Sequence, residues 1–201
     1  MTTPRDVMLI AVDVSADRPP EQGDLSLALA GAELIDLLGA RTATLDDARI
    51  VPGEGLPPSD HLMEQAAASI VREAPYEPVT DWLWRRGRGL AAAYLASLEA
   101  EGRLTRRRRR WTPFRTGQLV LADPRDRSRA QDRRASGEHA LAALTAAAGI
   151  GDQETRSSPG GAGGAVETVL AAVDDAVRDL EAVRQRRAIE QAAFDNVWRG
   201  Y

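Results

Sequence analysis

The chain has 201 residues, a net charge of −4, 43% hydrophobic residues and 28% charged residues. These proportions exclude a mostly disordered chain, a collagen-like fibre and a coiled coil throughout, and they indicate a soluble globular protein. The absence of cysteine excludes disulfides, thiol nucleophiles and cysteine-based metal sites, and with only two histidines the sequence predicts no metal ion and no cofactor.

The N-terminal segment predicts the centre of a helical core. Residues 7–14 are apolar and rich in β-branched side chains, a pattern that fits either a strand or a short buried helix. Residues 24–38 are apolar on almost all sides, so we expect a central helix that is N-capped by Asp24 and C-capped by Gly39. No signal peptide or membrane span is recognisable, which favours a cytoplasmic protein.

The middle of the chain predicts a hairpin followed by three helices. Asp46-Asp47-Ala48 is typical of a tight turn between two short strands. Ser59 is the expected N-cap of the next helix, and the prolines that follow it end that helix. In chain order, the predicted elements are strands at 41–45 and 49–51, a helix over 60–74, a short helix that begins at Thr80 or Asp81, and a helix over 89–101.

The remainder predicts a basic hairpin, two helices, a glycine-rich linker and a long amphipathic helix. These elements are strands at 103–111 and 117–122, helices over 124–139 and 141–150, a linker around 156–164, and an amphipathic helix over 166–197. The predicted fold class is therefore mainly α. We expect a compact helical domain over 4–150 with short β-hairpins, one of them basic and protruding, then a flexible linker over 151–165 and a C-terminal amphipathic helix over 166–201.

The basic residues are concentrated in one segment. All 26 are arginine, and residues 85–134 contain 15 of them with five acidic residues, which is a local net charge of +10. Because the whole chain carries −4, the rest of it carries −14. A local positive field of this size attracts polyanions such as phospholipids or nucleic acids, whatever the sign of the total charge.

Motifs of the common enzyme classes are absent, and we predict no catalytic residues. The chain has no GxxxxGK[ST] loop, no GxGxxG after a strand, no GxSxG and no HExxH. His61 and His139 each follow an acidic residue, but a histidine on a helix surface explains both. The sequence therefore favours a binding or interaction protein.

One candidate contact surface is the predicted basic hairpin. An arginine run followed closely by two aromatic residues is typical of a membrane interface, where rings lie at headgroup level and guanidinium groups meet phosphates. Two simpler explanations stay open: a charged strand edge that prevents aggregation, and aromatic rings that pack in a core or an oligomer contact. The residues are Arg106, Arg107, Arg108, Arg109, Arg110, Trp111 and Phe114.

A second candidate is a lipid-headgroup site formed by Arg85, Arg86 and Arg88, close to Trp82 and Trp84. These arginines directly precede a predicted helix, whose first backbone N–H groups are free to bind an anion. A solvated junction between two helices is the alternative explanation.

The order of several segments resembles the GPP34 (Golgi phosphoprotein 3) family, and in particular an actinobacterial-type member. In chain order the segments are MTTPRDVMLIAVDV, GDLSLALAGAELIDLLGA, TATLDDARIV, the helix before PYEP, and YLASLEAEGRLTRRRRR. The resemblance covers about residues 4–150 and rests most on LAGAELIDL and LEAEGRLTRR. It implies a mostly helical domain with a protruding hairpin and no enzymatic activity.

The resemblance also implies a function. Eukaryotic members are peripheral membrane adaptors that bind phosphatidylinositol 4-phosphate and retain Golgi glycosyltransferases, and their hairpin takes part in self-association and membrane contact. We therefore expect a peripheral adaptor at the inner face of the membrane that binds phosphoinositides or other anionic lipids. A second copy bound through the hairpin and a protein bound by the C-terminal helix are further expected partners.

The headgroup residues of the family are matched only in part. Of its two arginines that enter the third helix, one aligns with Arg88 and the other with Ala91. Its tryptophan and arginine around the first buried helix align with Glu21 and Ala30. These departures favour a general contact with anionic lipid over selectivity for phosphatidylinositol 4-phosphate.

Two other functions stay open. A helix, a glycine turn and a basic hairpin also form the layout of a winged-helix nucleic-acid-binding protein, although the helix over 90–101 has few side chains that read bases. Alternatively, the chain is a structural module whose C-terminal helix binds a partner protein.

Overall fold

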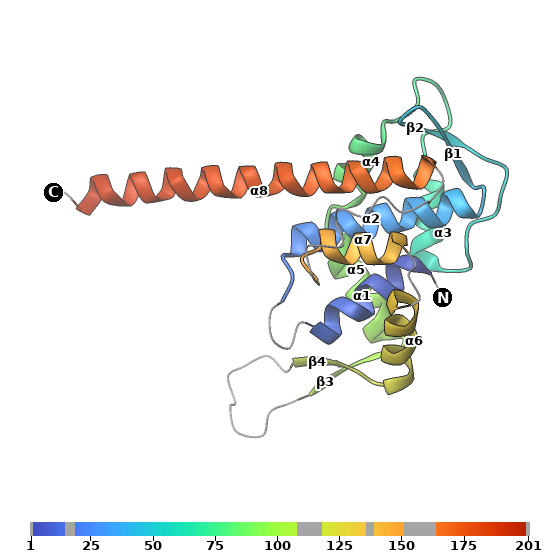
Figure 1. Cartoon of the computed structure of the whole chain (residues 1–201), viewed down its shortest axis with the longest axis horizontal. Helices are drawn as coiled ribbons and strands as arrows, with labels where there is room; N and C mark the ends of the chain where they lie inside the picture. The colour runs from blue at the N-terminus through green and yellow to red at the C-terminus, as the bar shows by residue number, and fades with distance from the viewer. Residues whose placement is uncertain (1, 15–18, 108–117, 136–138, 151–163, 200–201) are drawn as a thin grey trace.

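The computed structural model describes residues 2–14, 19–107, 118–135, 139–150 and 164–199. Within these residues the chain forms eight helices and two β-hairpins (Figure 1). The helices are α1 (Thr3–Val14), α2 (Gln22–Gly39), α3 (His61–Ala68), α4 (Val79–Arg86), α5 (Leu90–Ala100), α6 (Pro124–Ala135), α7 (His139–Ala147) and α8 (Gly164–Arg199). The strands are β1 (Ala43–Asp46), β2 (Arg49–Pro52), β3 (Leu104–Arg107) and β4 (Gln118–Leu121). The predicted mainly α fold, with short hairpins and a long C-terminal helix, is confirmed.

Helix α2 lies at the centre of the molecule, as its apolar sequence predicts. It packs against α1, α3, α4, α5, α7 and α8, and its residues Leu29, Leu34 and Leu37 are fully buried. A helix that is covered on all sides needs apolar residues on all sides. The rest of the fold is therefore arranged around α2.

The predicted caps of α2 were wrong. Glu21 is the N-cap, and Asp24 lies in the first turn, where it forms an ion pair with Arg184 of α8. Gly39 is the last helical residue, and Ala40 is the C-cap. The Asp24 carboxylate, which the local sequence predicts as the helix cap, thus pairs instead with an arginine of a helix far away in the chain.

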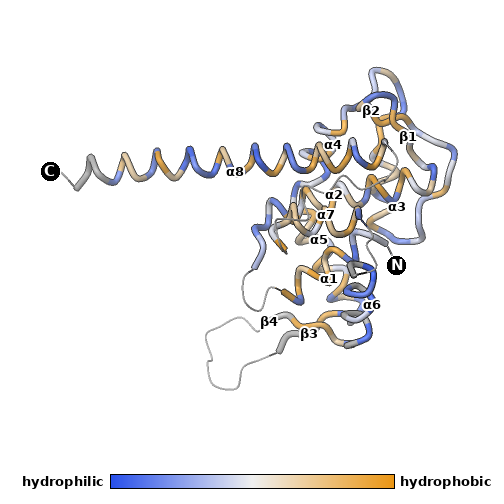
Figure 2. Tube along the Cα trace, viewed as in Figure 1, coloured by the Kyte–Doolittle hydropathy of each residue, from blue (hydrophilic) through white to orange (hydrophobic). Residues whose placement is uncertain are grey.

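The N-terminal apolar segment forms helix α1, so the strand interpretation of residues 7–14 was wrong and the buried-helix interpretation is confirmed. Residues 7–12 are all buried, because α1 packs against α2, α5, α6, α7 and β4. Figure 2 shows the same division of polarity: α1 and α2 are mostly hydrophobic, and α6, at the outside, is mostly hydrophilic.

Short-range signals set the ends of α3 and α5. Asp60, and not the predicted Ser59, is the N-cap of α3, because its carboxylate accepts hydrogen bonds from two backbone N–H groups of the first turn at 2.9 and 3.3 Å. The helix ends at Ala68, earlier than predicted. Gly89 precedes α5 at φ = 70°, a left-handed conformation that favours glycine.

The first hairpin and the base of the second form at the predicted segments, and residues 108–117 of the second lie outside the described residues. β1 pairs with β2 in antiparallel register, with Asp46 opposite Arg49 and Asp47 in the turn. β3 pairs with β4, with Leu104 opposite Leu121. The β3–β4 hairpin packs against α1, α5 and α6, so its base is fixed on the helical body.

The first half of α8 packs against α2, α4 and α7, and Val169 and Val173 are buried in this contact. The helices approach closely at Gly31 of α2, where a Cβ atom would lie 2.5 Å from Cγ2 of Val173. The C-terminal part of α8 extends past the body (Figure 1). Residues 185–194 are exposed. Within the described ranges, none of the helices, α8 included, has the length and apolarity that crossing a bilayer requires.

Candidate functional site

Arg85, one of the three arginines predicted for the headgroup site, is held in an ion pair. Its Nε and Nη2 atoms donate to the two carboxylate oxygens of Glu77 at 2.7 and 2.6 Å, and Nη2 also donates to the backbone oxygen of Ser69 at 3.0 Å. The guanidinium carbon lies 5.3 Å from the centroid of the Trp82 ring. Two parallel bonds to a carboxylate fix a guanidinium in place, so Arg85 ties α4 to the segment before it.

Arg86, the second predicted arginine, points into the core. Its Nε and Nη2 donate to Glu33 of α2 at 2.7 and 2.9 Å, and the hydroxyl of Tyr94 donates to the same carboxylate at 2.9 Å. Glu33 has no exposed side-chain surface. The pKa of Glu33 is raised overall, because burial raises it more than the hydrogen bonds from Arg86 and Tyr94 lower it. This buried cluster links α2, α4 and α5.

Arg88, the third, lines a surface groove of about 320 Å³. The groove lies where the first turn of α2, the end of α4, the start of α5 and α8 meet. Arg88 is exposed there, and no described residue forms an ion pair or hydrogen bond with its side chain. The lining consists of Gln22, Gly23, Ser26, Leu27, Trp84, Gly87, Arg88, Gly89, Ala92 and Leu180.

Two helix N-termini contribute to this Arg88 groove, because the first turns of both α2 and α5 line it. A helix N-terminus presents the positive end of the helix dipole, which stabilises an anion. The N–H groups of Leu90 and Ala91 at the start of α5 donate within the fold, Leu90 to the backbone oxygen of Gly87 at 3.2 Å, so they are not free, although the sequence predicts that they are. The Ser26 hydroxyl accepts a hydrogen bond from the backbone N of Ala91 at 3.2 Å and so joins the two first turns. Gly87 lies close to both α4 and α2, since a Cβ atom there would lie 2.6 Å from the backbone oxygen of Leu83 and 3.4 Å from that of Ser26.

Trp84 forms an aromatic part of the groove wall and is 39% exposed. A half-exposed tryptophan beside an arginine suits the headgroup level of a bilayer. The sequence already places Trp84 next to the arginines. It carries no signal for Leu180, which reaches the groove from α8.

The positions at which the chain departs from the family pattern are two buried alanines and one exposed glutamate. Ala30 and Ala91 are 0% and 4% exposed, and Glu21 is the exposed N-cap of α2. Among the described residues that line the groove, Arg88 is the one that carries a charge. The groove therefore offers a single guanidinium of its own to a ligand.

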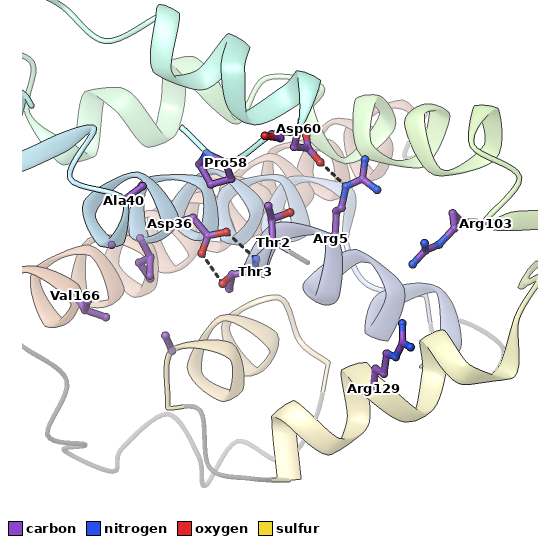
Figure 3. A pocket seen from close by; sticks show the side chains of 14 residues that line it. Thr2, Thr3, Arg5, Asp36, Ala40, Pro58, Asp60, Arg103, Arg129 and Val166 are labelled. Carbon is purple, nitrogen blue, oxygen red and sulfur yellow. Dashed lines mark hydrogen bonds and ion pairs between the residues drawn. The ribbon is translucent and has the colours of Figure 1, made fainter. Parts of the chain in front are cut away.

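A second hollow, of about 810 Å³, lies at the opposite end of α2 (Figure 3). At this basin the backbone N and the hydroxyl of Thr3 donate to the Asp36 carboxylate at 2.8 and 2.6 Å. Arg5 donates to Asp60 and, through Nη1 at 2.6 Å, to Glu101. The hydrogen bond from Arg5 lowers the pKa of Glu101.

The basin is a structural junction. Its carboxylates Asp36 and Asp60 and the guanidinium of Arg5 are paired within the fold and join α1, α2, α3 and α5. Arg103 and Arg129 line it on the other side of Arg5 from Thr3 (Figure 3). In the part of the chain that the structure describes, no three acidic or histidine side chains gather closely enough to hold a metal ion.

Most of the predicted hairpin contact lies outside the described residues. Arg106 and Arg107 lie in β3, opposite Leu119 and Gln118 of β4. The prediction for these side chains as a membrane contact stays a prediction. The members that fall outside the described residues are Arg108, Arg109, Arg110, Trp111 and Phe114.

Comparison with known protein families gives one finding. A family model described as Golgi phosphoprotein 3 (GPP34) matches residues 4–193. The match covers most of the chain and continues beyond the glycine-rich segment into α8. A search of curated proteins gives no match.

Proposed function

Since the chain belongs to the Golgi phosphoprotein 3 (GPP34) family, we propose that it is a peripheral membrane adaptor that binds the phosphate of anionic lipid headgroups in the Arg88 groove. The observation that carries the proposal is an exposed guanidinium in a groove that two helix N-termini line. Both features favour a phosphate over a neutral or cationic group.

The proposed ligand is an anionic headgroup in general. Arg88 is the single charged residue of the described lining, and the positions of the other family arginines are the buried Ala30 and Ala91. One guanidinium and two helix N-termini recognise a phosphate group but offer little to distinguish one phosphorylated inositol from another lipid phosphate. Selectivity for phosphatidylinositol 4-phosphate is therefore not part of the proposal.

The basic hairpin is the proposed second contact with the membrane. Each basic residue near an anionic surface contributes about 1 kcal/mol to binding, so the run Arg106–Arg110 would add to the affinity without adding selectivity. Trp111 and Phe114 would enter the headgroup region. The proposed location is the inner face of the membrane, and the proposal includes no catalytic step.

Co-sedimentation with liposomes tests this function. The full chain is mixed with vesicles of phosphatidylcholine alone, or with added phosphatidylglycerol, phosphatidylinositol or phosphatidylinositol 4-phosphate, at two salt concentrations. We expect similar binding to all anionic vesicles, weaker binding at high salt because the attraction is screened, and none to the neutral vesicles.

The variant Arg88→Gln should bind about fivefold more weakly, as expected for one basic group at an anionic surface. Arg178→Gln is the matched control, because it removes the same charge from a side chain that is 71% exposed and pairs with Asp175 of its own helix. Equal binding of the wild type and Arg88→Gln would reject the site. Binding of duplex DNA, with none to any vesicle, would favour the winged-helix function instead.

A further inference from the structure

The C-terminal helix forms part of the Arg88 groove. Leu180 of α8 is one of the lining residues, and it packs over Gly23 in the first turn of α2. A Cβ atom at position 23 would lie 2.6 Å from Cδ2 of Leu180 and 3.0 Å from Nη2 of Arg184. The absence of a side chain at Gly23 therefore lets Leu180 line the groove and Arg184 lie directly beside Gly23.

Arg184 forms an ion pair beside this groove, next to the lining residue Gly23. Its Nη2 lies 2.8 Å from Oδ1 of Asp24, and its Nη1 donates to Oδ2 of the same carboxylate at 3.1 Å. The side chains of Arg184 and Asp24 are 29% and 15% exposed, so the pair is partly shielded from solvent. Asp24 directly follows Gly23, which lines the groove.

We propose that Arg184 sets the charge of the Arg88 groove by neutralising Asp24, and that α8 thereby makes the groove accessible to a lipid phosphate. This inference rests on the proposed function and adds a positioning residue to it. Without Arg184, the Asp24 carboxylate would carry an unpaired negative charge beside the groove, which would repel an incoming phosphate and oppose the attraction of Arg88. Arg184 acts through Asp24 rather than by touching the ligand.

The other charges near Arg184 make its role necessary. Glu181 lies one turn before it on α8, with Oε2 3.5 Å from Nη1, and Glu21, the N-cap of α2, also interacts with it electrostatically. Three carboxylates, Glu21, Asp24 and Glu181, thus surround Arg184 beside the groove that Arg88 lines. Loss of Arg184 would leave Arg88 as the single cation against these three carboxylates.

Charge-changing variants in the full chain test the inference by co-sedimentation with phosphatidylglycerol vesicles at low salt. Arg184→Gln should weaken binding about fivefold, and Asp24→Asn should strengthen it by about the same factor. The double variant Asp24→Asn/Arg184→Gln removes one charge of each sign and should bind within about twofold of the wild type. Arg184→Lys keeps the charge and should bind better than Arg184→Gln.

Controls separate this effect from misfolding and from total charge. Arg178→Gln, on the same helix, changes the net charge as much as Arg184→Gln does and should leave binding unchanged. Thermal unfolding of each variant establishes that α8 remains folded. Because the double variant lacks the ion pair yet should recover binding, a loss of binding through undocking of α8 would not reproduce the expected pattern.

The possible results distinguish this inference from the function on which it rests. Normal binding by Arg184→Gln together with weak binding by Arg88→Gln would overturn the role of Arg184 and keep the proposed function. A double variant as weak as Arg184→Gln would also overturn the role, since it would mean that Arg184 contacts the phosphate itself or that α8 needs the ion pair to stay docked. Normal binding by Arg88→Gln would reject both.

Discussion

The two ends of α2 carry similar residues and use them differently. At the C-terminal end, in the basin, the Asp36 carboxylate accepts hydrogen bonds from Thr3, and Arg5 donates to Asp60 and Glu101. At the N-terminal end, Arg88 is exposed in a groove without a described ion-pair partner. The side chains of the larger hollow, the basin, thus hold several helices together, whereas the smaller Arg88 groove presents a positive charge to solvent.

The pairing of arginines within the fold, more than their number, decides where a candidate binding site lies. Arg85, Arg86 and Arg88 lie within one short segment, yet Glu77 pairs with Arg85 at the surface and Glu33 holds Arg86 in the core. A charge that a protein pairs internally mainly holds its structure together, whereas an exposed charge in a concave surface can attract a ligand. The same reasoning identifies the Arg88 groove as a candidate binding site at one end of α2 and excludes Arg5 as a ligand-binding residue at the other end.

The largest effect should come from the basin. Asp60→Ala removes the N-cap of α3 and leaves Arg5 without one of its two carboxylates, so we expect a loss of about 3 kcal/mol in the free energy of unfolding. Urea unfolding measures this loss. Vesicle binding, at a temperature where the variant is folded, should match the wild type. A large fall in binding would show that the two ends of α2 are not independent.

A smaller loss of stability should come from the groove. Ser26→Ala deletes the acceptor for the backbone N–H of Ala91 and leaves this buried group unpaired. We expect the free energy of unfolding to fall by about 1 kcal/mol, as for the loss of one neutral hydrogen bond. Urea unfolding again provides the measurement. A loss of unfolding free energy as large as that of Asp60→Ala would contradict the expectation that Ser26 contributes a single neutral hydrogen bond to stability.

The basin should also make stability depend on acid pH. Arg5 lowers the pKa of Glu101, so the folded chain keeps this carboxylate ionised at a pH where the unfolded chain has already protonated it. Because the unfolded state then binds more protons, this contribution is present above the ordinary pKa of glutamate and is lost as pH falls through the lowered value. Glu101→Gln should therefore show a shallower loss of stability on acidification than the wild type. Parallel pH profiles of the unfolding free energy for both chains would refute the contribution.

The smallest effect on stability should come from Trp84. This side chain is half-exposed, and its removal in Trp84→Ala should change the free energy of unfolding by no more than about 0.5 kcal/mol. Vesicle binding should nevertheless fall, because the groove would lose its aromatic wall. Leu56→Ala, at another exposed apolar residue, is the control and should bind normally. Equal binding by both variants would remove Trp84 from the proposed site.

Much of the fold follows from local patterns. The apolar sequence of α2 predicts a central helix, and the turn at Asp46–Ala48 predicts the first hairpin. The N-terminal segment was ambiguous because α1 is buried on all sides and so lacks a helical period. Caps were misplaced where a distant side chain decides the outcome, as Arg184 does for Asp24.

The candidate site was only partly predictable for the same reason. The sequence places three arginines before α5, but it does not show that Arg86 forms a buried ion pair with Glu33 of α2. Nor does it show that Leu180 completes the groove from the other end of the chain. Contacts between residues far apart in the chain decide which arginine reaches solvent, and no local pattern records them.

The projection of α8 beyond the body has a hydrodynamic consequence. At 1.5 Å per residue, its 36 residues span about 54 Å, whereas a compact chain of this length has a radius of gyration of only about 16 Å. A rod attached to a smaller body diffuses more slowly than a sphere of equal mass, and its tumbling is anisotropic. A monomer of 21.7 kDa should therefore elute early from a size-exclusion column and imitate an oligomer, so its association state has to be read from light scattering or sedimentation.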